Sequence, residues 1–202
     1  MGFRIVVLVS GSGTLLQSLI DAQQAGGLGA EIVAVGADRS RIAGLERAER
    51  AGIQTFSHRY RKGTDRAVWD SELTDLVAEY QPDLVVLAGF MKLVGSSFLE
   101  RFGGKIINSH PALLPSFPGM HGARDALEYG VKITGATVFL VDEGVDSGAI
   151  LAQQAVEVLD DDTEQGLHER IKISERQLLV QVVGSLANRR WHIEGRKVRW
   201  DS

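Results

Sequence analysis

Hydrophobic residues in the first two-thirds of this chain switch repeatedly between two spacings. In some stretches they follow one another without interruption, as in a strand that is buried on both faces. In the stretches between, they recur every three or four positions, as on one face of an amphipathic helix. Strands and helices that alternate in this way build βαβ units and a parallel sheet. We expect strands at residues 4–9, 31–37 and 83–88, and helices at residues 14–25, 42–51 and 65–80.

The pattern changes in the second half of the chain. We expect a short helix at residues 123–129, extended strands at 134–141 and 149–158, a long helix at 163–187 and a short extended tail at 198–200. The sequence therefore predicts an α/β fold. Its sheet is a Rossmann-like open sheet with a parallel N-terminal half, a mixed C-terminal half and helices on both faces.

Composition excludes several kinds of site and partner. The 202 residues contain no cysteine, which excludes disulfides, thiol nucleophiles and thiolate metal sites. A net charge of −4 argues against a nucleic-acid partner, and we interpret the basic residues between Arg189 and Arg199 as a solvated tail. The first apolar run is too short for a secretory signal or a membrane span, so we expect a cytoplasmic protein with no membrane partner. Histidine spacing predicts no metal.

The most informative segment is the end of the apolar run at residues 105–107, where Asn108, Ser109 and His110 precede Pro111. Proline has no N–H for a sheet ladder, so the strand ends here. Two-residue spacing directs Asn108 and His110 to one face. An amide can stabilise an oxyanion, and an imidazole can move a proton near neutral pH. The alternative is that both side chains satisfy local backbone groups in a turn.

Two further segments are candidates for chemistry. The acidic stretch at residues 142–148 lies between two apolar runs and could bring a carboxylate to His110, or it could be an ordinary solvated loop. After the first strand, residues 10–14 read Ser-Gly-Ser-Gly-Thr and lead into a helix, where free N–H groups could bind a phosphate. This loop lacks the third glycine of a dinucleotide site and the lysine of a P-loop, so a monophosphate site or a tight turn remains.

These segments together resemble the phosphoribosylglycinamide formyltransferases, within the wider formyltransferase superfamily. The resemblance rests on residues 9–17 (VSGSGTLLQ), 87–91 (LAGFM), 108–115 (NSHPALLP) and 142–148 (DEGVDSG), and it extends over nearly the whole chain. It implies a single formyltransferase domain over residues 1–202, with a phosphate-binding βαβ half at 1–104 and a catalytic and folate-binding half at 105–202. It also implies small-molecule substrates and a monomer or homodimer.

The resemblance assigns roles to individual residues. Asn108, His110 and Asp146 are expected to be catalytic. The ribonucleotide phosphate is expected at Ser10, Gly11, Ser12, Gly13, Thr14 and Leu15, and the glycinamide portion at Glu175 and Lys172. The folate is expected to contact Arg66, Met91, Lys92, Leu93, Val94, Asn108, Asp142, Glu143, Gly144, Val145 and Asp146. The residues alone would make Arg66 and Glu175 ordinary exposed helix charges. Leu15 replaces a common asparagine, and Lys92 replaces a frequent arginine, which loses a planar fork.

The implied reaction transfers the formyl group of 10-formyltetrahydrofolate to the amine of N1-(5-phosphoribosyl)glycinamide in purine synthesis, without a metal. Asn108 and His110 would stabilise the oxyanion, and Asp146 would favour the protonated ring or order a proton-relaying water. Ser109 is a weak candidate nucleophile because alternation turns it away from His110. A formyltetrahydrofolate hydrolase, a methionyl-tRNA formyltransferase-like enzyme and a non-catalytic nucleotide-binding module are the alternatives.

Overall fold

The computed structural model describes residues 2–201, and they fall into two compact units. The first unit ends at Asn108 and the second begins at Ser109. The boundary therefore falls within the strand that carries the most informative sequence segment. The finer division into functional halves at residues 104 and 105 stays a prediction.

The first unit is a parallel sheet with strand order β3-β2-β1-β4-β5. Val9 of β1 lies opposite Ala37 of β2, and Leu87 of β4 lies opposite Asn108 of β5, so the carboxyl ends of the strands share one edge. The predicted parallel N-terminal half is confirmed. Its elements are β1 (Phe3–Val9), α1 (Thr14–Gln24), β2 (Ala30–Ala37), α2 (Ala43–Arg50), β3 (Gln54–Ser57), α3 (Arg66–Ala78), β4 (Leu84–Leu87), α4 (Ser96–Phe102) and the start of β5 (Ile106–His110).

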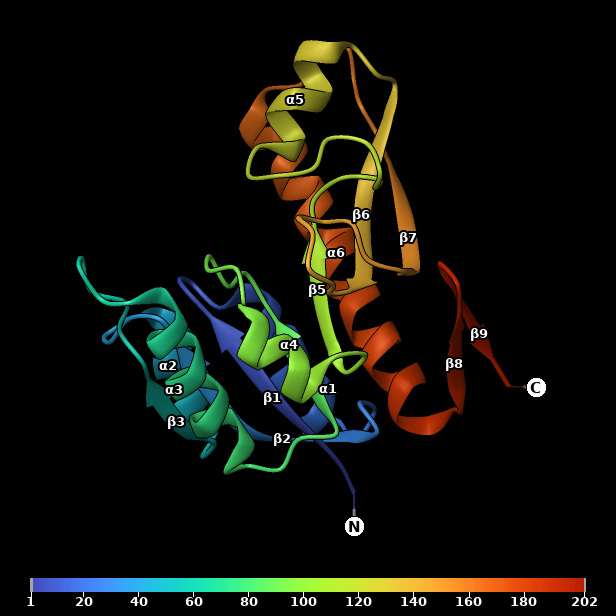
Figure 1. The fold of residues 1–202 in the computed structure, drawn as a ribbon. Helices are drawn as coiled ribbons and strands as arrows, with labels where there is room; N and C mark the ends of the chain where they lie inside the picture. The colour runs from blue at the N-terminus through green and yellow to red at the C-terminus, as the bar shows by residue number, and fades with distance from the viewer. Residues whose placement is uncertain (1, 202) are drawn as a thin grey trace. The chain divides into compact units, whose positions relative to one another are not determined.

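Helices cover both faces of this sheet because the strand order reverses at β1. Strands β2 and β3 are added on one side of β1, whereas β4 and β5 are added on the other. Right-handed crossovers then put α1 and α2 on one face and α3 and α4 on the opposite face. In agreement, α1 contacts α2 and α3 contacts α4 (Figure 1). Residues Ile5 to Val9 of β1 are completely buried, as expected for a strand covered on both faces.

The second unit is mixed, as predicted. Strands β6 and β7 pair antiparallel, β9 pairs parallel with β7, and β8 pairs antiparallel with β9. The long helix α6 packs along β6 and β7 (Figure 1), and residues of its buried face such as Leu167, Ile171 and Leu179 lie in the core. The elements are α5 (Gly122–Tyr129), β6 (Ile133–Leu140), β7 (Ile150–Glu157), α6 (Glu164–Asn188), β8 (Trp191–Glu194) and β9 (Lys197–Trp200).

Three elements, β3, α4 and β8, were not predicted. The basic C-terminal residues are exposed and residues 198–200 are extended, as expected, but they do not form a loose tail. Strand β3 has no residue that is fully buried, and β8 is mostly exposed, so neither shows a continuous apolar run. The C-terminal residues instead form the β8–β9 hairpin, in which β9 pairs with β7.

Among residues 2–201, none of the helices has the length and apolar character that crossing a membrane requires.

Helix α4 was missed because a residue on another helix holds its N-terminus. The buried Asp70 of α3 accepts hydrogen bonds from the backbone N–H groups of Gly95, at 2.5 Å, and Phe98, at 3.1 Å. N–H groups in the first turn of a helix have no carbonyl partner within that helix. The carboxylate therefore caps α4 from α3, and a local sequence pattern does not record such a contact.

We predict that Asp70→Ala lowers the free energy of unfolding by about 2–3 kcal/mol, because two buried N–H groups lose a charged acceptor. Chemical denaturation at neutral pH measures this change. The exposed Asp75 of the same helix is the control, and Asp75→Ala should change stability by less than about 0.5 kcal/mol. Equal effects of the two substitutions would contradict the capping role of Asp70.

Candidate functional site

The glycine loop, residues 10–14, joins β1 to α1 at the carboxyl edge of the first unit. Gly13 is the N-cap of α1 and has a φ of 69°, and a Cβ atom there would lie 2.6 Å from the Cα of Gly44. Glycine is therefore required here for both backbone conformation and close packing. Gly11 and Ser12 are exposed, whereas the side chain of Leu15 is buried. Only the backbone N–H of Leu15 could contact a ligand.

Helix α2 binds the carbonyl groups of this loop. The backbone N–H of Gly44 donates to the carbonyl of Gly11 at 3.0 Å, and Nε of Arg47 donates to the carbonyl of Ser12 at 2.8 Å. In a trans peptide the N–H points opposite to the C=O. The N–H groups that follow these carbonyls, those of Ser12 and Gly13, therefore point away from α2. Arg47 was not singled out in the sequence, where it reads as an exposed charge of an amphipathic helix.

The segment after β4, residues 91–94, lies beside the glycine loop. The backbone N–H of Met91 donates to Oγ of Ser10 at 2.8 Å, and the N–H of Ser10 donates to the carbonyl of Gly89 at 3.2 Å. Met91 and Leu93 are 60% and 67% exposed, which is unusual for large apolar side chains. The first unit thus brings the predicted phosphate loop together with part of the predicted folate segment.

Arg66 supports the same segment from α3. Its Nη2 donates to the carbonyl of Leu93, and its guanidinium carbon lies 4.5 Å from the ring centroid of Trp69 and 5.2 Å from that of Tyr60. A guanidinium stacked on two aromatic rings is held in place by cation–π attraction. Arg66 is therefore a fixed, half-buried cation, and the interpretation of it as an ordinary exposed helix charge is wrong.

Asp38, which the sequence analysis missed, lies beside Lys92. It follows β2 directly, and only 2% of its side chain is exposed. Its Oδ2 lies 4.0 Å from Nζ of Lys92 and 3.5 Å from Nη2 of Arg39. Nζ of Lys92 also lies 5.5 Å from the Tyr60 ring centroid. The signal that could have identified Asp38 is an acidic residue immediately after a buried strand, at the edge where ligands bind.

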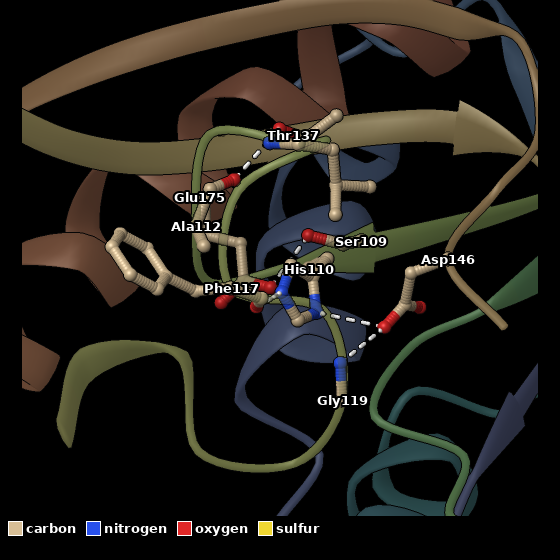
Figure 2. A network of polar contacts seen from close by, with 9 residues as sticks. Ser109, His110, Ala112, Phe117, Gly119, Thr137, Asp146 and Glu175 are labelled. Atoms are coloured by element: carbon tan, nitrogen blue, oxygen red, sulfur yellow. Dashed lines mark hydrogen bonds and ion pairs between the residues drawn. The ribbon is translucent and has the colours of Figure 1, made fainter. Parts of the chain in front are cut away.

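The second unit brings His110 and Asp146 together (Figure 2). Nδ1 of His110 lies 3.5 Å from Oδ2 of Asp146, and Nε2 of His110 lies 2.7 Å from the carbonyl of Phe117. The same Oδ2 accepts the backbone N–H of Gly119 at 2.8 Å. A carbonyl only accepts, so the tautomer compatible with this contact carries its proton on Nε2. Nδ1 then faces the carboxylate of Asp146.

Asp146 lies in the acidic loop, residues 142–147, between β6 and β7. Oδ1 of Asp142 accepts the backbone N–H of Gly144 at 3.0 Å and the hydroxyl of Ser147 at 2.6 Å, which closes the loop internally. Glu143 is exposed, and Val145 is an exposed apolar residue, at 54%. The loop therefore presents an apolar side chain and a carboxylate next to each other, instead of being only a solvated connection.

Glu175 is buried, contrary to the interpretation of it as an ordinary exposed helix charge. It accepts the hydroxyl of Ser109 at 2.6 Å and is only 6% exposed (Figure 2). Burial raises the pKa of Glu175, while the Ser109 hydrogen bond and the charges of Lys172 and Arg176 partly oppose this shift. Lys172 itself pairs with Glu169 at 2.9 Å. Ser109 thus points to α6, whereas His110 contacts Phe117 and Asp146, as strand alternation requires.

Thr137 of β6 holds the segment that follows β5, and the sequence analysis did not identify it. Its hydroxyl donates to the carbonyl of Ala112 at 2.7 Å and accepts the backbone N–H of Leu114 at 3.0 Å. The side chain is completely buried.

Within residues 2–201 there is no group of three or more histidine, cysteine, aspartate or glutamate side chains arranged to hold a metal.

Comparison with known proteins identifies one family. Residues 3–183 match the family described as formyl transferase. A phosphoribosylglycinamide formyltransferase of Mycobacterium tuberculosis (strain CDC 1551 / Oshkosh) is 54% identical over 193 residues, which cover 96% of this chain and 89% of that protein. The trifunctional purine biosynthetic protein adenosine-3 of Drosophila melanogaster is 42% identical over 187 residues, or 92% of this chain and 14% of that protein.

Solved structures give the same result as the comparison of sequences. The crystal structure of glycinamide ribonucleotide transformylase 1 from Symbiobacterium toebii is similar to this chain with a TM-score of 0.95 and 42% identity, and the match covers 98% of this chain and 94% of that one. The predicted Rossmann-like α/β class is therefore confirmed.

The raised pKa of Glu175 predicts how the stability of the folded chain depends on pH. A carboxyl group with a raised pKa in the folded state favours folding fully below its ordinary pKa of 4.5, and this contribution is lost as the pH rises through the raised value. Glu175→Gln imitates the neutral form. The stability of the native chain relative to the Gln variant should therefore fall as the pH rises from 4.5.

Urea denaturation of both proteins from about pH 4.5 to pH 8 measures this difference. Glu169→Gln is the control on the same helix, because Lys172 lowers the pKa of the exposed Glu169 and its contribution is lost toward low pH instead. A stability difference between native chain and Glu175→Gln that stays constant over this range would contradict the effect of burial.

Proposed function

The chain belongs to the formyl transferase family, and on that premise we propose that it transfers the formyl group of 10-formyltetrahydrofolate to the amine of N1-(5-phosphoribosyl)glycinamide in purine synthesis. The predicted family and the predicted enzyme class, a formyl transferase, are confirmed by this membership. The observation that carries the proposed reaction is the buried pair of His110 and Asp146, with Asn108 two positions before the histidine on β5.

The glycine loop supports a phosphate-bearing substrate. The carbonyl groups of Gly11 and Ser12 are bound by α2, so the N–H groups of Ser12 and Gly13 point away from that helix, where a ligand could bind them. The loop also leads into the N-terminus of α1, where the helix dipole favours an anion. We assign the ribonucleotide phosphate to Ser10, Gly11, Ser12, Gly13, Thr14 and Leu15, with backbone N–H groups as the donors.

Residues 91–94 suit a flat, partly apolar cosubstrate such as a folate. Met91 and Leu93 expose large apolar side chains, and the backbone of the segment is held by Ser10 and Arg66. Pockets for such ligands combine apolar walls with a few polar groups in fixed positions. We assign the folate to Arg66 and residues 91–94 in the first unit and to Asn108, Asp142, Glu143, Gly144, Val145 and Asp146.

The proposed reaction forms a bond between the substrate amine and the formyl carbon, breaks the bond from that carbon to the folate nitrogen, and moves one proton between the two nitrogens. Asn108 donates its amide N–H to the formyl oxygen as negative charge develops there. His110, when protonated, stabilises the same charge electrostatically, because its two ring nitrogens already contact Phe117 and Asp146. Asp146 faces Nδ1 of His110 at 3.5 Å and can order a water that relays the proton.

Glu175 and Lys172 are assigned to the glycinamide portion of the substrate, and this assignment rests on the resemblance. Glu175 can accept an N–H or hydroxyl hydrogen when it is ionised, and Ser109 already occupies its Oε1.

Competing functions give different products: a formyltetrahydrofolate hydrolase releases formate without the ribonucleotide, and a methionyl-tRNA formyltransferase formylates the charged tRNA. Formyl transfer that requires glycinamide ribonucleotide supports the proposal, and formate release without it contradicts the proposal.

We predict that Asp146→Asn lowers the turnover number of this transfer by roughly a hundredfold, because the substitution removes the charge beside His110 while keeping the size of the side chain. Steady-state kinetics with both substrates measures the change. The Michaelis constant for the ribonucleotide should stay nearly constant, and Asp161→Asn, at an exposed position after β7 and outside the proposed site, is the control. Near-native turnover in a folded Asp146→Asn protein would refute the mechanism.

We predict that Arg47→Met raises the Michaelis constant for the ribonucleotide by about tenfold, since the loop loses the group that orients the peptide between Ser12 and Gly13. The Michaelis constant for the folate should change by less than about twofold. Methionine forms helices well, so α2 should be preserved. Arg50→Met is the control, because Nε of Arg50 donates to the carbonyl of Glu46 on its own helix. An equal change in both Michaelis constants would argue against a phosphate at this loop.

A further inference from the structure

The C-terminal hairpin lies next to the acidic loop. Lys197, the first residue of β9, pairs with Ile150, the first residue of β7, and Glu194 pairs with Lys197 across the turn. Gly195 and Arg196 form that turn, with a φ of 62° at Gly195. Because β7 begins just after the acidic loop, this register places Arg196 at the end of the loop.

Arg196 binds the backbone of the acidic loop directly. Its Nη2 donates to the carbonyl of Ser147 at 2.7 Å. The hydroxyl of the same serine donates to Oδ1 of Asp142 at 2.6 Å. Ser147 is therefore held twice, once by the other end of the loop and once by the hairpin. Only glycine fits at the next position, since a Cβ atom at Gly148 would lie 1.6 Å from the carbonyl oxygen of Leu140.

The position of Ser147 bears on His110 through Asp146, which precedes it. Asp146 has a φ of 52°, in the left-handed region that residues other than glycine seldom adopt. Such a conformation persists only where the surrounding structure imposes it. The carboxylate of Asp146 must reach both Nδ1 of His110, at 3.5 Å, and the N–H of Gly119, at 2.8 Å. The carbonyl of Ser147 belongs to the peptide that joins Ser147 to Gly148, so Arg196 restrains the chain one residue beyond Asp146. A shift of the chain at Ser147 would redirect the side chain of Asp146.

We propose that Arg196 is a positioning residue for Asp146: the C-terminal hairpin holds the carbonyl of Ser147 and thereby keeps the carboxylate directed at His110. The inference rests on the proposed function for its kinetic consequence. Its structural consequence, a loop that is ordered by Arg196, does not depend on which reaction the chain catalyses.

A matched control exists on the same hairpin. Arg199 carries the same charge, and its Nε donates to Glu194 within the hairpin at 3.0 Å. Arg196→Ala and Arg199→Ala therefore change the net charge equally, and only the first removes a contact with the acidic loop. Arg196→Lys restores a charged donor without the fork geometry.

The first measurement is hydrogen exchange of the full-length proteins, followed in the peptide that contains the acidic loop. Arg196→Ala should accelerate exchange there by about fivefold, the factor expected for the loss of one hydrogen bond. Arg199→Ala should leave the exchange rate of the loop unchanged, and Arg196→Lys should give an intermediate rate. Equal exchange rates for the Arg196→Ala and Arg199→Ala proteins would overturn the proposal, whatever the reaction.

The second measurement separates positioning from general stability. Arg196→Ala should lower the turnover number by about tenfold with little change in the Michaelis constant for the ribonucleotide. In the Asp146→Asn background the same substitution should cost less than about twofold, because its effect passes through the missing carboxylate. A full tenfold loss in that background would show that Arg196 acts by another route and would overturn the inference. Absence of formyl transfer by the native chain would count against the proposed function, and hydrogen exchange would then decide the positioning role alone.

Discussion

The alternation of side chains along β5 is the constraint on which the functional residues depend. A strand directs successive side chains to opposite faces, so Ser109 and His110 cannot share surroundings. Ser109 bonds to the buried Glu175 of α6, and His110 contacts Phe117 and Asp146. A shift of register by one residue would exchange these two environments. The imidazole would then meet a carboxylate in the helix-covered core, and the serine would face the acidic loop.

Both units use backbone geometry to prepare polar groups before any ligand binds. In the first unit α2 binds the carbonyl groups of Gly11 and Ser12, and in the second unit Thr137 and Asp146 hold the segment that follows β5. Groups that are already oriented do not have to be ordered during binding or reaction, so less conformational entropy is lost. The long-range hydrogen bonds therefore matter for function at least as much as for stability.

The sequence predicted those features that short-range patterns encode. Strands β1, β2, β4 and β5 of the parallel sheet, the glycine loop at the N-terminus of α1 and the strand end at Pro111 all follow from hydrophobic spacing and from the backbone limits of glycine and proline. Features that depend on distant residues were missed or misread. Helix α4 depends on Asp70, the buried Glu175 has its hydrogen-bond partner on β5, and Asp38 becomes a candidate only when its position beside Lys92 is known. The β8–β9 hairpin was misread because its charged residues are the same ones that a solvated tail would contain.

The hydroxyl of Ser10 joins two segments of the first unit that are 81 residues apart in the sequence. It accepts the N–H of Met91, and its own backbone N–H donates to Gly89, so the glycine loop and residues 91–94 share a hydrogen-bonded link. An anion that orders the loop also restrains the segment, and a ligand that orders the segment also restrains the loop. Thermodynamic linkage makes such an effect reciprocal, so each ligand would change the affinity for the other by the same factor. On the proposed assignment, this serine side chain would couple phosphate binding to folate binding.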